Sequence, residues 1–406
     1  MSSLRTILLC LALLAGAAPA AFAQGLTALA RVDAAASSIH DEVGRLVVDL
    51  ALSQPVPWRA YTLERPRRLV IDFSEALFDA VPVAASPRAT AVSAGPIQPG
   101  WSRLVVELGE ALAIETAGLD TAAPAGQARL TLRLAPVSAA AFAAASGAPP
   151  DLGRLLPEAV IPAPPPKPQD RLRIVLDPGH GGIDPGAQYD GLTEADLMLT
   201  FARELRELLR RAGFDVAMTR DADVFVPLEA RVTFAREAEA DLFLSLHADS
   251  LPEEAGSAHG ATVYVLSEEA SDMASRRLAE RQDGADLVAG VDVTGQGDEI
   301  ALVLMEIARV ETEPRTRRLA EHLIAGITAE AGRMNHRPLR SANFSVLRSP
   351  AVPSVLLELG FLSSPRDRAR IADPDWRAKA AAGIRDAIVL WAAEETARAP
   401  LLRTAP

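Results

Sequence analysis

A proline-rich segment in the middle of the chain limits how this sequence can fold. Five of the eight residues in Ile161-Pro-Ala-Pro-Pro-Pro-Lys-Pro168 are proline. Proline at this density removes backbone donors and favours a stiff, extended conformation, so neither a strand nor a helix can run through the segment. We interpret residues 136–170, which are rich in alanine before the prolines, as a linker that holds two domains apart. A ligand for a proline-recognition domain is the alternative. The 406 residues are enough for two domains and a linker.

The N-terminus has the pattern of a secretion signal. A short basic start is followed by an apolar run over residues 7–20 and by Ala21-Phe-Ala23, a small-x-small cleavage site. We predict that residues 1–23 are a cleaved signal peptide and that the mature protein is secreted; a retained N-terminal anchor is the alternative. The apolar run is short for a membrane span, and no later segment approaches about 20 uninterrupted apolar residues.

Cysteine content and charge exclude several kinds of site. Cys10, the only cysteine, lies in the predicted leader, so the mature chain is expected to have neither disulfides nor thiolate metal ligands. A metal site must then use histidine and carboxylate ligands. The net charge is -12 and aromatic residues make up 4% of the chain, which argues against a nucleic-acid partner and against stacking of single strands.

Residues 26–135 have the pattern of a small β domain. Four segments combine Val, Ile and Leu with interspersed charge, each opens with Arg-Leu, and turn-rich sequence separates them. This pattern is typical of half-buried strands, and its recurrence predicts a small all-β sandwich with an internal repeat. The predicted strands are 45–50, 68–73, 103–108 and 129–134. We assign no catalysis to this region, because it contains no cluster of histidine and acidic residues.

From residue 171 onward the sequence alternates strand and helix patterns. This predicts an α/β domain with a mostly parallel sheet flanked by helices. A helix is expected from Thr193, whose hydroxyl can cap it, to Gly213, and another opens near Pro227. A last helix carries an apolar stripe from Trp376 to Trp391. The predicted strands are 174–176, 214–219, 241–247, 261–266, 345–348 and 354–359.

Two histidines and a glutamate are expected at one edge of this sheet. His180 follows the strand at 174–176 and an Asp-Pro-Gly turn, and His247 ends another strand. Glu194 opens the helix after the first strand, so all three side chains can face the carboxyl edge at which open α/β sheets bind ligands. Two histidines and a carboxylate, with one coordination position left for water, form the ligand set of a catalytic zinc site. Zinc lowers the pKa of bound water toward about 7 and polarises a scissile carbonyl.

A zinc hydrolase also needs a base that takes the proton from water and passes it to the leaving group. Glu358, near the end of another core strand, is positioned for this role. Each residue taken alone has a structural alternative: a locally bonded loop histidine for His180, an acid that complements a helix dipole for Glu194, and a strand-end carboxylate paired with an arginine for Glu358. The four residues are scattered, so the interpretation depends on their meeting at one edge.

The remaining histidines of this region are weaker candidates for ligands. His259 precedes a strand, His322 lies in a predicted helix, and His336 lies in a basic turn. We expect each of them to face solvent or to bond locally. His259 is the one to test as a substrate contact.

Four motifs follow one another in this region: Leu176-Asp-Pro-Gly-His-Gly-Gly182, Gly191-Leu-Thr-Glu194, Ser245-Leu-His-Ala-Asp249 and Val355-Leu-Leu-Glu-Leu-Gly-Phe-Leu-Ser363. Together they resemble the zinc-dependent N-acetylmuramoyl-L-alanine amidases of the Amidase_3 family, and the resemblance covers residues 171–395. It implies that His180, Glu194 and His247 bind Zn2+ and that Glu358 is the catalytic glutamate. It also implies cleavage of the peptidoglycan amide bond between N-acetylmuramic acid and the L-Ala of the stem peptide.

The N-terminal region, including Glu64-Arg-Pro-Arg-Arg-Leu-Val-Ile-Asp-Phe73, resembles the AMIN domain, which localises cell-wall enzymes to the envelope. A generic β module is the alternative. An AMIN-like domain ahead of an amidase domain is the layout of Gram-negative cell-division amidases. The resemblance therefore implies a periplasmic enzyme of cell-wall remodelling and daughter-cell separation, which we expect to be a monomer.

Residues 284–313 look like a regulatory insertion ahead of a helix near residue 316. The part from 298 to 309 has a helical pattern that is apolar beyond a single face, so it must bury more than one side or bind something when released. Similar insertions in division amidases hold a helix over the zinc site until an activator with a LytM-type domain displaces it. Our hypothesis is that Glu299 or Glu306 reaches the metal in the resting state; an ordinary packed helix is the alternative.

Two other functions are compatible with the sequence. One is a zinc carboxypeptidase that acts within the stem peptide. The other is a catalytically silent protein that binds the cell wall. The presence of all four motif residues argues against silence, because loss of Glu358 would be its expected mark.

Overall fold

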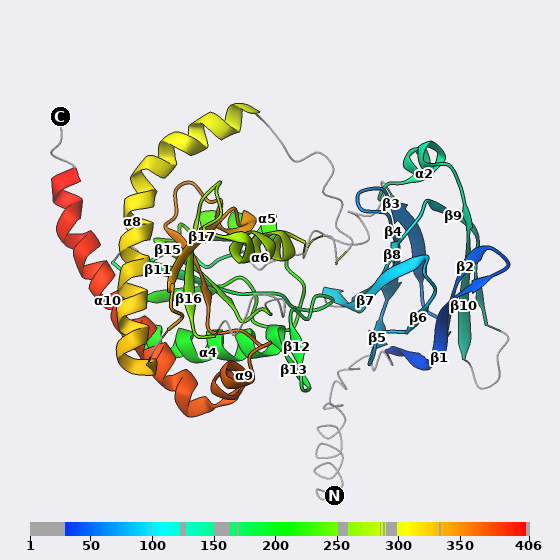
Figure 1. Cartoon of the computed structure of the whole chain (residues 1–406), viewed down its shortest axis with the longest axis horizontal. Coiled ribbons are helices and arrows are strands. Elements are labelled where there is room, and N and C mark those ends of the chain that lie inside the picture. Colours follow the sequence, from blue (N-terminus) through cyan, green and yellow to red (C-terminus); the bar gives the residue numbers. More distant parts are fainter. Residues whose placement is uncertain are drawn as a thin grey trace, which may run out of the picture.

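The structure is a computed structural model in which two domains lie side by side (Figure 1). For residues 98, 299–310 and 399–402 it describes the backbone alone, and the predicted leader, residues 1–23, lies outside the described residues. The structure describes residues 29–98, 100–121, 127–149, 163–168, 170–250, 259–284, 286, 289, 299–332 and 334–402.

The N-terminal domain is a β-sandwich, as the sequence predicts. One sheet has the order β5-β1-β2-β10-β9, with β6 paired to β1, and the other has the order β3-β4-β8-β7. The four predicted Arg-Leu segments lie within β2, β4, β8 and β10, two in each sheet, and their apolar residues meet in one core. The strands are β1 (Ala30–Glu42), β2 (Arg45–Leu52), β3 (Trp58–Leu63), β4 (Arg68–Ser74), β5 (Ala76–Phe78), β6 (Ala84–Ala85), β7 (Ala89–Gln98), β8 (Trp101–Leu108), β9 (Leu112–Asp120) and β10 (Ala128–Pro136).

The segment that the sequence assigns to the linker is packed against both domains. Helix α2 (Ala139–Ala145) inserts Phe142, which is 1% exposed, into the core of the sandwich. At the other end, the Arg173 guanidinium donates to the carbonyls of Pro165 and Pro166, and Lys167 pairs with Asp241. The expectation that the linker holds the domains apart is wrong, because buried apolar residues of the two domains pack together.

The C-terminal domain is built on a six-stranded sheet of order β14-β11-β15-β18-β16-β17. Strands β14, β11, β15 and β18 are parallel, while β16 is antiparallel to β18 and parallel to β17, so the predicted mostly parallel sheet is confirmed. The strands are β11 (Arg173–Pro178), β14 (Asp215–Met218), β15 (Leu242–His247), β16 (Thr262–Leu266), β17 (Leu339–Ala342) and β18 (Ser354–Glu358), and β12 (Gln188–Tyr189) and β13 (Leu192–Thr193) form a separate ribbon.

Helices cover both faces of this sheet, because alternate residues of its central strands point to opposite sides. Ile174 and Leu176 of β11 pack with residues of α4, α8 and α10, whereas Val175 packs with residues of α5 and α6. The predicted stripe of the last helix is buried here, from Ala380 to Trp391. The helices are α4 (Glu194–Arg211), α5 (Leu228–Glu237), α6 (Met273–Asp283), α8 (Glu299–Ala331), α9 (Pro365–Ala372) and α10 (Pro374–Leu402).

Three local features differ from the sequence prediction. The predicted strand at 345–348 is the 3-10 helix η3 (Ser345–Leu347), in which Val346 and Leu347 are buried without pairing to a strand. The sequence did not predict β17, a short and largely polar strand. The predicted helices at 298–309 and near 316 are one helix, α8, whose 33 residues include Pro314.

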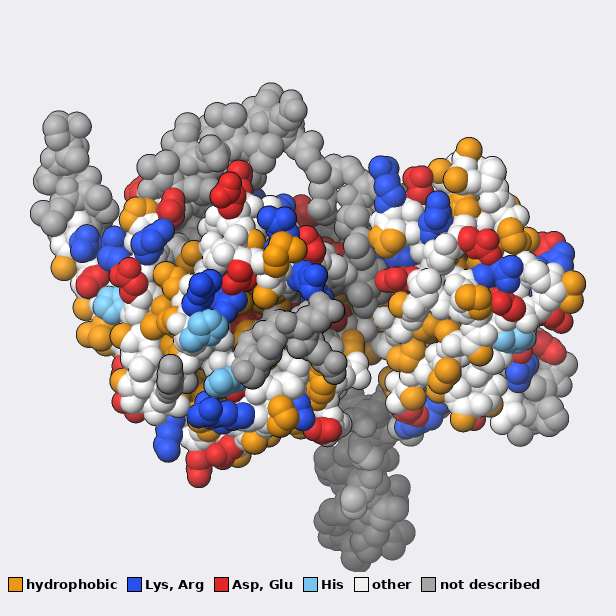
Figure 2. All heavy atoms as spheres, in the orientation of Figure 1, with side chains coloured by type: hydrophobic (Ala, Val, Ile, Leu, Met, Phe, Trp, Pro, Cys, Tyr) orange, Lys and Arg blue, Asp and Glu red, His pale blue; other side chains and the backbone are white. Residues whose placement is uncertain are grey.

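Two further features concern the charges on the surface and the hydrophobicity of the helices. On the face shown in Figure 2, basic and acidic side chains are intermixed over both domains. None of the helices in the described part of the chain is long and apolar enough to cross a membrane.

Candidate metal centre

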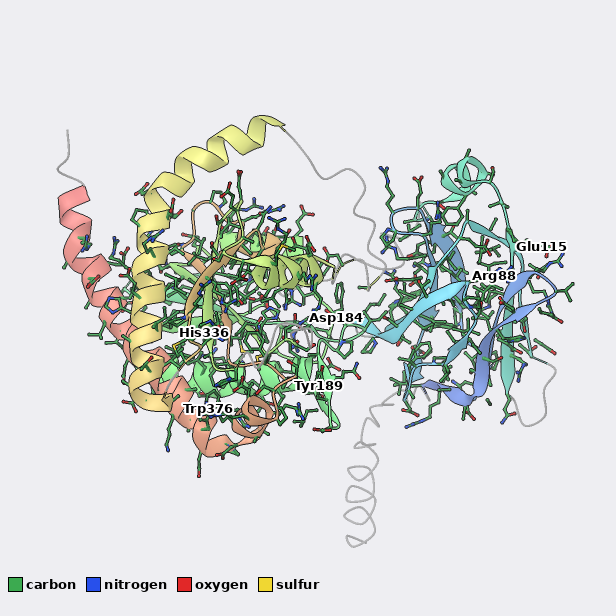
Figure 3. All side chains as sticks on the ribbon, in the orientation of Figure 1. Arg88, Glu115, Asp184, Tyr189, His336 and Trp376 are labelled. Carbon is green, nitrogen blue, oxygen red and sulfur yellow. The ribbon has the colours of Figure 1, made fainter. Side chains whose placement is uncertain are left out.

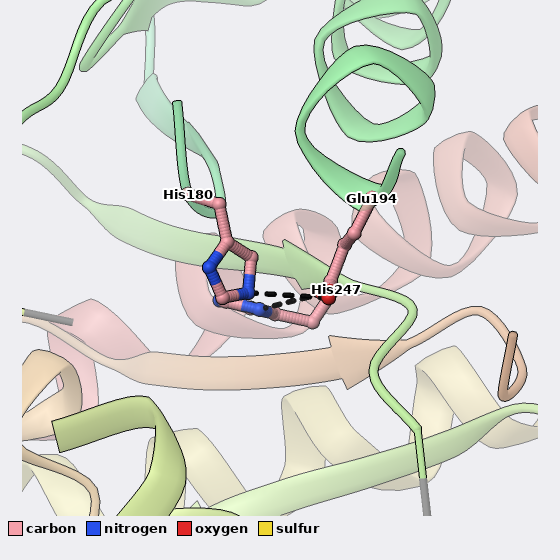
Figure 4. Close-up of side chains that lie close together, drawn as sticks. All are labelled: His180, Glu194 and His247. Atoms are coloured by element: carbon pink, nitrogen blue, oxygen red, sulfur yellow. Dashed lines mark hydrogen bonds and ion pairs between the residues drawn. The ribbon is translucent and has the colours of Figure 1, made fainter. Parts of the chain in front are cut away.

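Three elements bring the predicted ligands together at one edge of the sheet. His180 lies in the loop after β11, His247 is the last residue of β15, and Glu194 is the first residue of α4. Strands β11 and β15 are parallel neighbours, so their carboxyl ends meet. Possible ligand atoms of the three residues all lie within 4.8 Å of one another, and Figure 4 shows the three side chains converging. The sequence placed these residues at one edge, and the structure groups them there.

Glycines in the loop after β11 make room for this cluster. A Cβ atom on Gly179 would lie 2.2 Å from Cε1 of His247, and one on Gly186 would lie 2.7 Å from Cδ2 of His180. His180 itself has a φ of 59°, followed by 126° at Gly181 and 61° at Gly182. Positive φ is unfavourable for a histidine, so surrounding contacts must hold the backbone in this conformation.

Glu194 is fixed by the start of its helix and by backbone donors. Thr193 caps α4 as predicted, with its side chain accepting from the backbone N–H of Asp196. The Glu194 carboxylate, which is fully buried, accepts from the backbone N–H groups of Ala248 at 2.8 Å and Ala187 at 3.0 Å. These bonds leave the same carboxylate 3.1 Å from Nδ1 of His247 and 3.2 Å from Nε2 of His180.

Asp184 orients His180, and the sequence reading missed it. Its Oδ2 atom lies 2.7 Å from Nδ1 of His180, so this ring nitrogen is engaged and Nε2 faces the centre of the cluster. Carboxylates commonly hold metal-binding histidines in this way. The signal available in the sequence was an acidic residue four positions after His180 in the same glycine-rich loop.

Two buried arginines hydrogen-bond to the backbone of the loop that carries His180. Arg231 donates to Asp177 Oδ1 at 2.7 Å and to the carbonyl of His180 at 2.9 Å. Arg220 donates at 2.8 Å both to the carbonyl of Gly179 and to that of Ala195, which follows Glu194. The arginines therefore tie the His180 loop to the start of α4, and so fix one ligand relative to another.

The charges in the cluster shift the pKa values of its members in opposite directions. Burial alone would lower the pKa of His180, but the carboxylates of Asp184 and Glu194 outweigh it and hold the pKa well above its usual value. Burial would raise the pKa of Glu194, but His180 and His247 hold it well below the usual value. The site is therefore arranged for a negative carboxylate beside a positive charge.

Glu358 lies at the same edge, one strand away. It ends β18 directly opposite His247 of β15, and its Oε2 atom accepts from the backbone N–H of Asp249 at 3.0 Å. Burial raises its pKa well above the usual value, and the nearby Glu194 and Asp249 carboxylates add to the effect. Burial and Glu194 also raise the pKa of Asp249, which pairs with Arg281 of α6.

Two buried polar atoms in the cluster lack hydrogen-bond partners among the described residues. They are Oε1 of Glu358 and Nε2 of His180, which lies 3.2 Å from the Glu194 carboxylate without the geometry of a hydrogen bond. A metal ion would bind to Nε2 of His180, and a water molecule or a substrate would hydrogen-bond to Oε1 of Glu358. Two imidazoles and a carboxylate are a donor set that suits zinc, so His180, Glu194 and His247 fit a metal site.

The comparison with protein families decides the identity. The Amidase_3 family, described as N-acetylmuramoyl-L-alanine amidase, matches residues 174–389. The chain belongs to the Amidase_3 family.

Individual relatives of this amidase carry the same description. N-acetylmuramoyl-L-alanine amidase AmiC of Neisseria meningitidis is 34% identical over 352 residues, which cover 80% of this chain and 82% of that protein. The amidase AmiA of Escherichia coli is 37% identical over 218 residues, 53% of this chain and 74% of that protein. Among solved structures, amidase AmiC2 of Nostoc punctiforme is 27% identical with a TM-score of 0.40, and covers 55% of this chain and 97% of that one.

The other histidines of the amidase domain lie outside the cluster. His259 and His336 are exposed, and His322 lies 3.4 Å from Glu394. The backbone carbonyl of His259 accepts from the side chain of Asn335, which lies shortly before β17. The side chains of Glu299 and Glu306 lie outside the described residues.

Proposed function

We propose that the chain is a zinc-dependent N-acetylmuramoyl-L-alanine amidase that cleaves the bond between N-acetylmuramic acid and the L-Ala of the stem peptide. Membership of the Amidase_3 family supports the reaction class. The observation that carries the mechanism is the convergence of His180, Glu194 and His247 within 4.8 Å, with the catalytic candidate Glu358 beside them.

Different side chains of the protein would bind the metal and transfer the proton during hydrolysis. His180, Glu194 and His247 would hold the ion, and a bound zinc ion would supply Lewis acidity and a more acidic water molecule. Glu358, whose buried Oε1 atom has no hydrogen-bond partner among the described residues, would accept a proton from the attacking water and return it to the leaving amine. A raised pKa suits both tasks, because it makes the carboxylate a stronger base and the protonated form easier to reach.

The same proposal includes the location of the enzyme, its targeting to the envelope by the AMIN-like β domain, and the regulation of its activity. The leader, residues 1–23, would direct export, and its cleavage would release the enzyme into the periplasm, where its substrate lies. The relatives named amidase AmiC and AmiA support a role in the cell wall, and we extend it to daughter-cell separation. We also propose that an activator with a LytM-type domain releases a resting state in which Glu299 or Glu306 occupies the metal.

The reaction is tested on the mature chain, residues 24–406, loaded with zinc and incubated with peptidoglycan. Mass spectrometry should find free stem peptides that begin at L-Ala, and Glu358→Gln should abolish them. Peptides shortened within the stem would instead indicate a carboxypeptidase. Binding to peptidoglycan without any product, both in the wild type and after Glu299→Ala and Glu306→Ala, would indicate a silent wall-binding protein.

The resting-state proposal has its own readout. If one of the two glutamates blocks the metal, its replacement by alanine should raise basal activity without the activator, whereas the other replacement should not. Equal activity in both variants and the wild type would contradict the proposed inhibition, while leaving the reaction itself established.

A further inference from the structure

The β domain contacts the amidase domain directly beside the metal loop. Ile97 of β7 and Val105 of β8 form a buried apolar cluster with Ile183, Phe225 and Ala289 of the amidase domain, and Trp101 packs against it. In Figures 1 and 3, the end of β7 points at this side of the amidase domain, where Asp184 is labelled. We call this face of the β domain, formed by residues 95–97, 101, 103 and 105, the β7–β8 face.

The contact is made between backbones as well as side chains. The backbone N–H of Ile183 donates to the carbonyl of Pro96 at 3.0 Å. A Cβ atom on Gly95 would lie 2.9 Å from Cα of Ile183, and one on Gly182 would lie 2.2 Å from the carbonyl oxygen of Pro96. Strand β7 is an edge of its sheet, so its backbone is free to approach the loop this closely.

A buried polar group of the β domain adds a second contact. Arg103 of β8 pairs with the fully buried Asp72 at 2.6 Å and donates to the carbonyl of Ala289 at 2.9 Å. The pair with Asp72 thus orients the Arg103 guanidinium within the β domain, from which it donates to the amidase domain. A preorganised donor loses little conformational freedom when it binds the carbonyl.

The contacted loop is the one whose backbone needs support. Residues 180, 181 and 182 all have positive φ, and Ile183 follows them directly. On one side, Arg231 and Arg220 bond the carbonyls of His180 and Gly179. On the other side, Pro96 binds the N–H of Ile183. The loop carrying His180 is therefore held between its own domain and the β domain.

We propose that the β7–β8 face is a docking surface for the metal loop, and that the docked β domain helps to hold His180 in its metal-binding position. The partner of this surface is the amidase domain of the same chain. The effect on metal binding rests on the proposed zinc site, whereas the effect on the loop does not.

Two substitutions in the β domain, outside the metal loop itself, test the docking. Gly95→Val places a wedge whose nearest neighbours are Ile183 and Gly182 of the other domain. Ile97→Asp puts a charge into the buried apolar cluster between the domains. Val83→Asp is the matched control, because Val83 lies in the same domain and is 77% exposed.

Hydrogen exchange of the metal-free, full-length mature protein is the first readout. Peptides that contain residues 179–187 should exchange about tenfold faster in both docking variants than in the wild type and in the control, because Ile183 loses its acceptor. Peptides from β4 and β15, in the two cores, should exchange at wild-type rates, which shows that both domains remain folded. Unchanged exchange of the loop in both variants would overturn the docking proposal.

Zinc affinity, measured by competition with a chelator, is the second readout. We expect about tenfold weaker binding in both docking variants, in the range seen when groups that orient a ligand are removed. A wild-type affinity in variants whose loop exchanges faster would overturn the support of His180. Failure of the wild type to bind zinc would contradict the proposed function and the support of His180 together, whereas the exchange data would still decide the docking.

Discussion

The Nδ1 atom of His180 lies 2.7 Å from the Oδ2 atom of Asp184, and both residues belong to one loop. Asp184 is 7% exposed, and its other oxygen accepts from the backbone N–H of Gly186 at 3.1 Å. This carboxylate therefore fixes the imidazole ring and directs Nε2 at the neighbouring ligands. The geometry leads to the first prediction.

Asp184→Asn should weaken zinc binding by about 10- to 100-fold, because the neutral amide orients the ring less firmly and no longer raises its basicity. Chelator competition measures the affinity, and circular dichroism checks the fold. Asp190→Asn is the control, since Asp190 is exposed and pairs with Arg368 in the same region. Equal zinc affinity in Asp184→Asn and the wild type would show that the contact does not serve the metal.

Glu358→Gln should lower kcat by about 10²- to 10⁴-fold, the usual contribution of a general acid–base residue, and should leave zinc bound. Glutamine keeps the size of the side chain and its bond to Asp249, so the strand end should not rearrange. A loss of zinc together with activity would instead assign Glu358 to the metal site.

The pH profile of kcat/KM gives a separate check on Glu358. The group works as a base, so activity should fall as pH drops through its pKa. Because burial is the main cause of the raised pKa of Glu358, the acid limb should lie above the usual range of a glutamate. Stopped assays on soluble muropeptides from pH 4 to 9 measure the limb, and an acid limb near pH 4 would contradict this placement.

Zinc binding should release a proton from the metal-free protein. Asp184 and Glu194 outweigh burial and hold the pKa of His180 well above its usual value, so the imidazole is protonated near neutral pH before the metal arrives. A ligand must lose this proton, and the apparent affinity should therefore rise about tenfold per pH unit below that pKa. Calorimetry in buffers of different ionisation enthalpy counts the protons, and an affinity independent of pH from 5 to 7 would contradict the prediction.

The sequence predicted those site residues whose chemistry and position along a strand are visible without a structure. His180 closely follows a strand, His247 and Glu358 each end one, and Glu194 begins a helix. Parallel strands bring such ends together. The predicted strands of both domains follow from runs of Val, Ile and Leu bounded by turns. The segment 345–348 has the same composition but is buried through η3, because burial does not require strand pairing.

The residues that the sequence did not reveal act through contacts between distant elements. Arg231 lies on α5, 54 positions after the Asp177 that it pairs with. Arg103 lies in another domain from Ala289, to which it donates. Neither partner could be chosen from spacing, because many arginines and acids are available along the chain. The docking of the domains was missed for the same reason, since proline content predicts a stiff linker but not where its ends are packed.

The buried pair of Arg231 and Asp177 should make the amidase domain sensitive to acid. Burial would raise the pKa of Asp177, but Arg231 and the hydroxyls of Thr219 and Ser245 outweigh it and lower the pKa. A carboxylate with a lowered folded pKa stabilises the fold above its unfolded pKa of about 3.9, and this stabilisation is lost as the pH falls through the folded value. The free energy of unfolding should therefore decrease less between pH 5 and pH 3 in Asp177→Asn than in the wild type.

Removal of Arg231 alone should be more damaging than removal of both charges. Arg231→Met leaves Asp177 buried without its cation, at a cost of about 3–5 kcal/mol. The double variant with Asp177→Asn should recover part of that loss. Urea denaturation at pH 7 measures both, and a double variant that is as unstable as Arg231→Met would show that the loop carbonyls, rather than the ion pair, dominate the role of Arg231.

Phe142→Ala should destabilise the β domain although Phe142 lies in the segment that the sequence assigns to the linker. The ring is 1% exposed in the core of the sandwich, so its loss should cost about 3–5 kcal/mol, as for other buried aromatic residues. Phe142→Leu keeps most of the apolar volume and should cost much less. Hydrogen exchange of peptides from β2 and β4 in the full-length protein reports on this domain alone, since the amidase domain has its own core. Equal exchange in Phe142→Ala and the wild type would mean that α2 is an appendage, and that the sandwich is complete without the residues after β10.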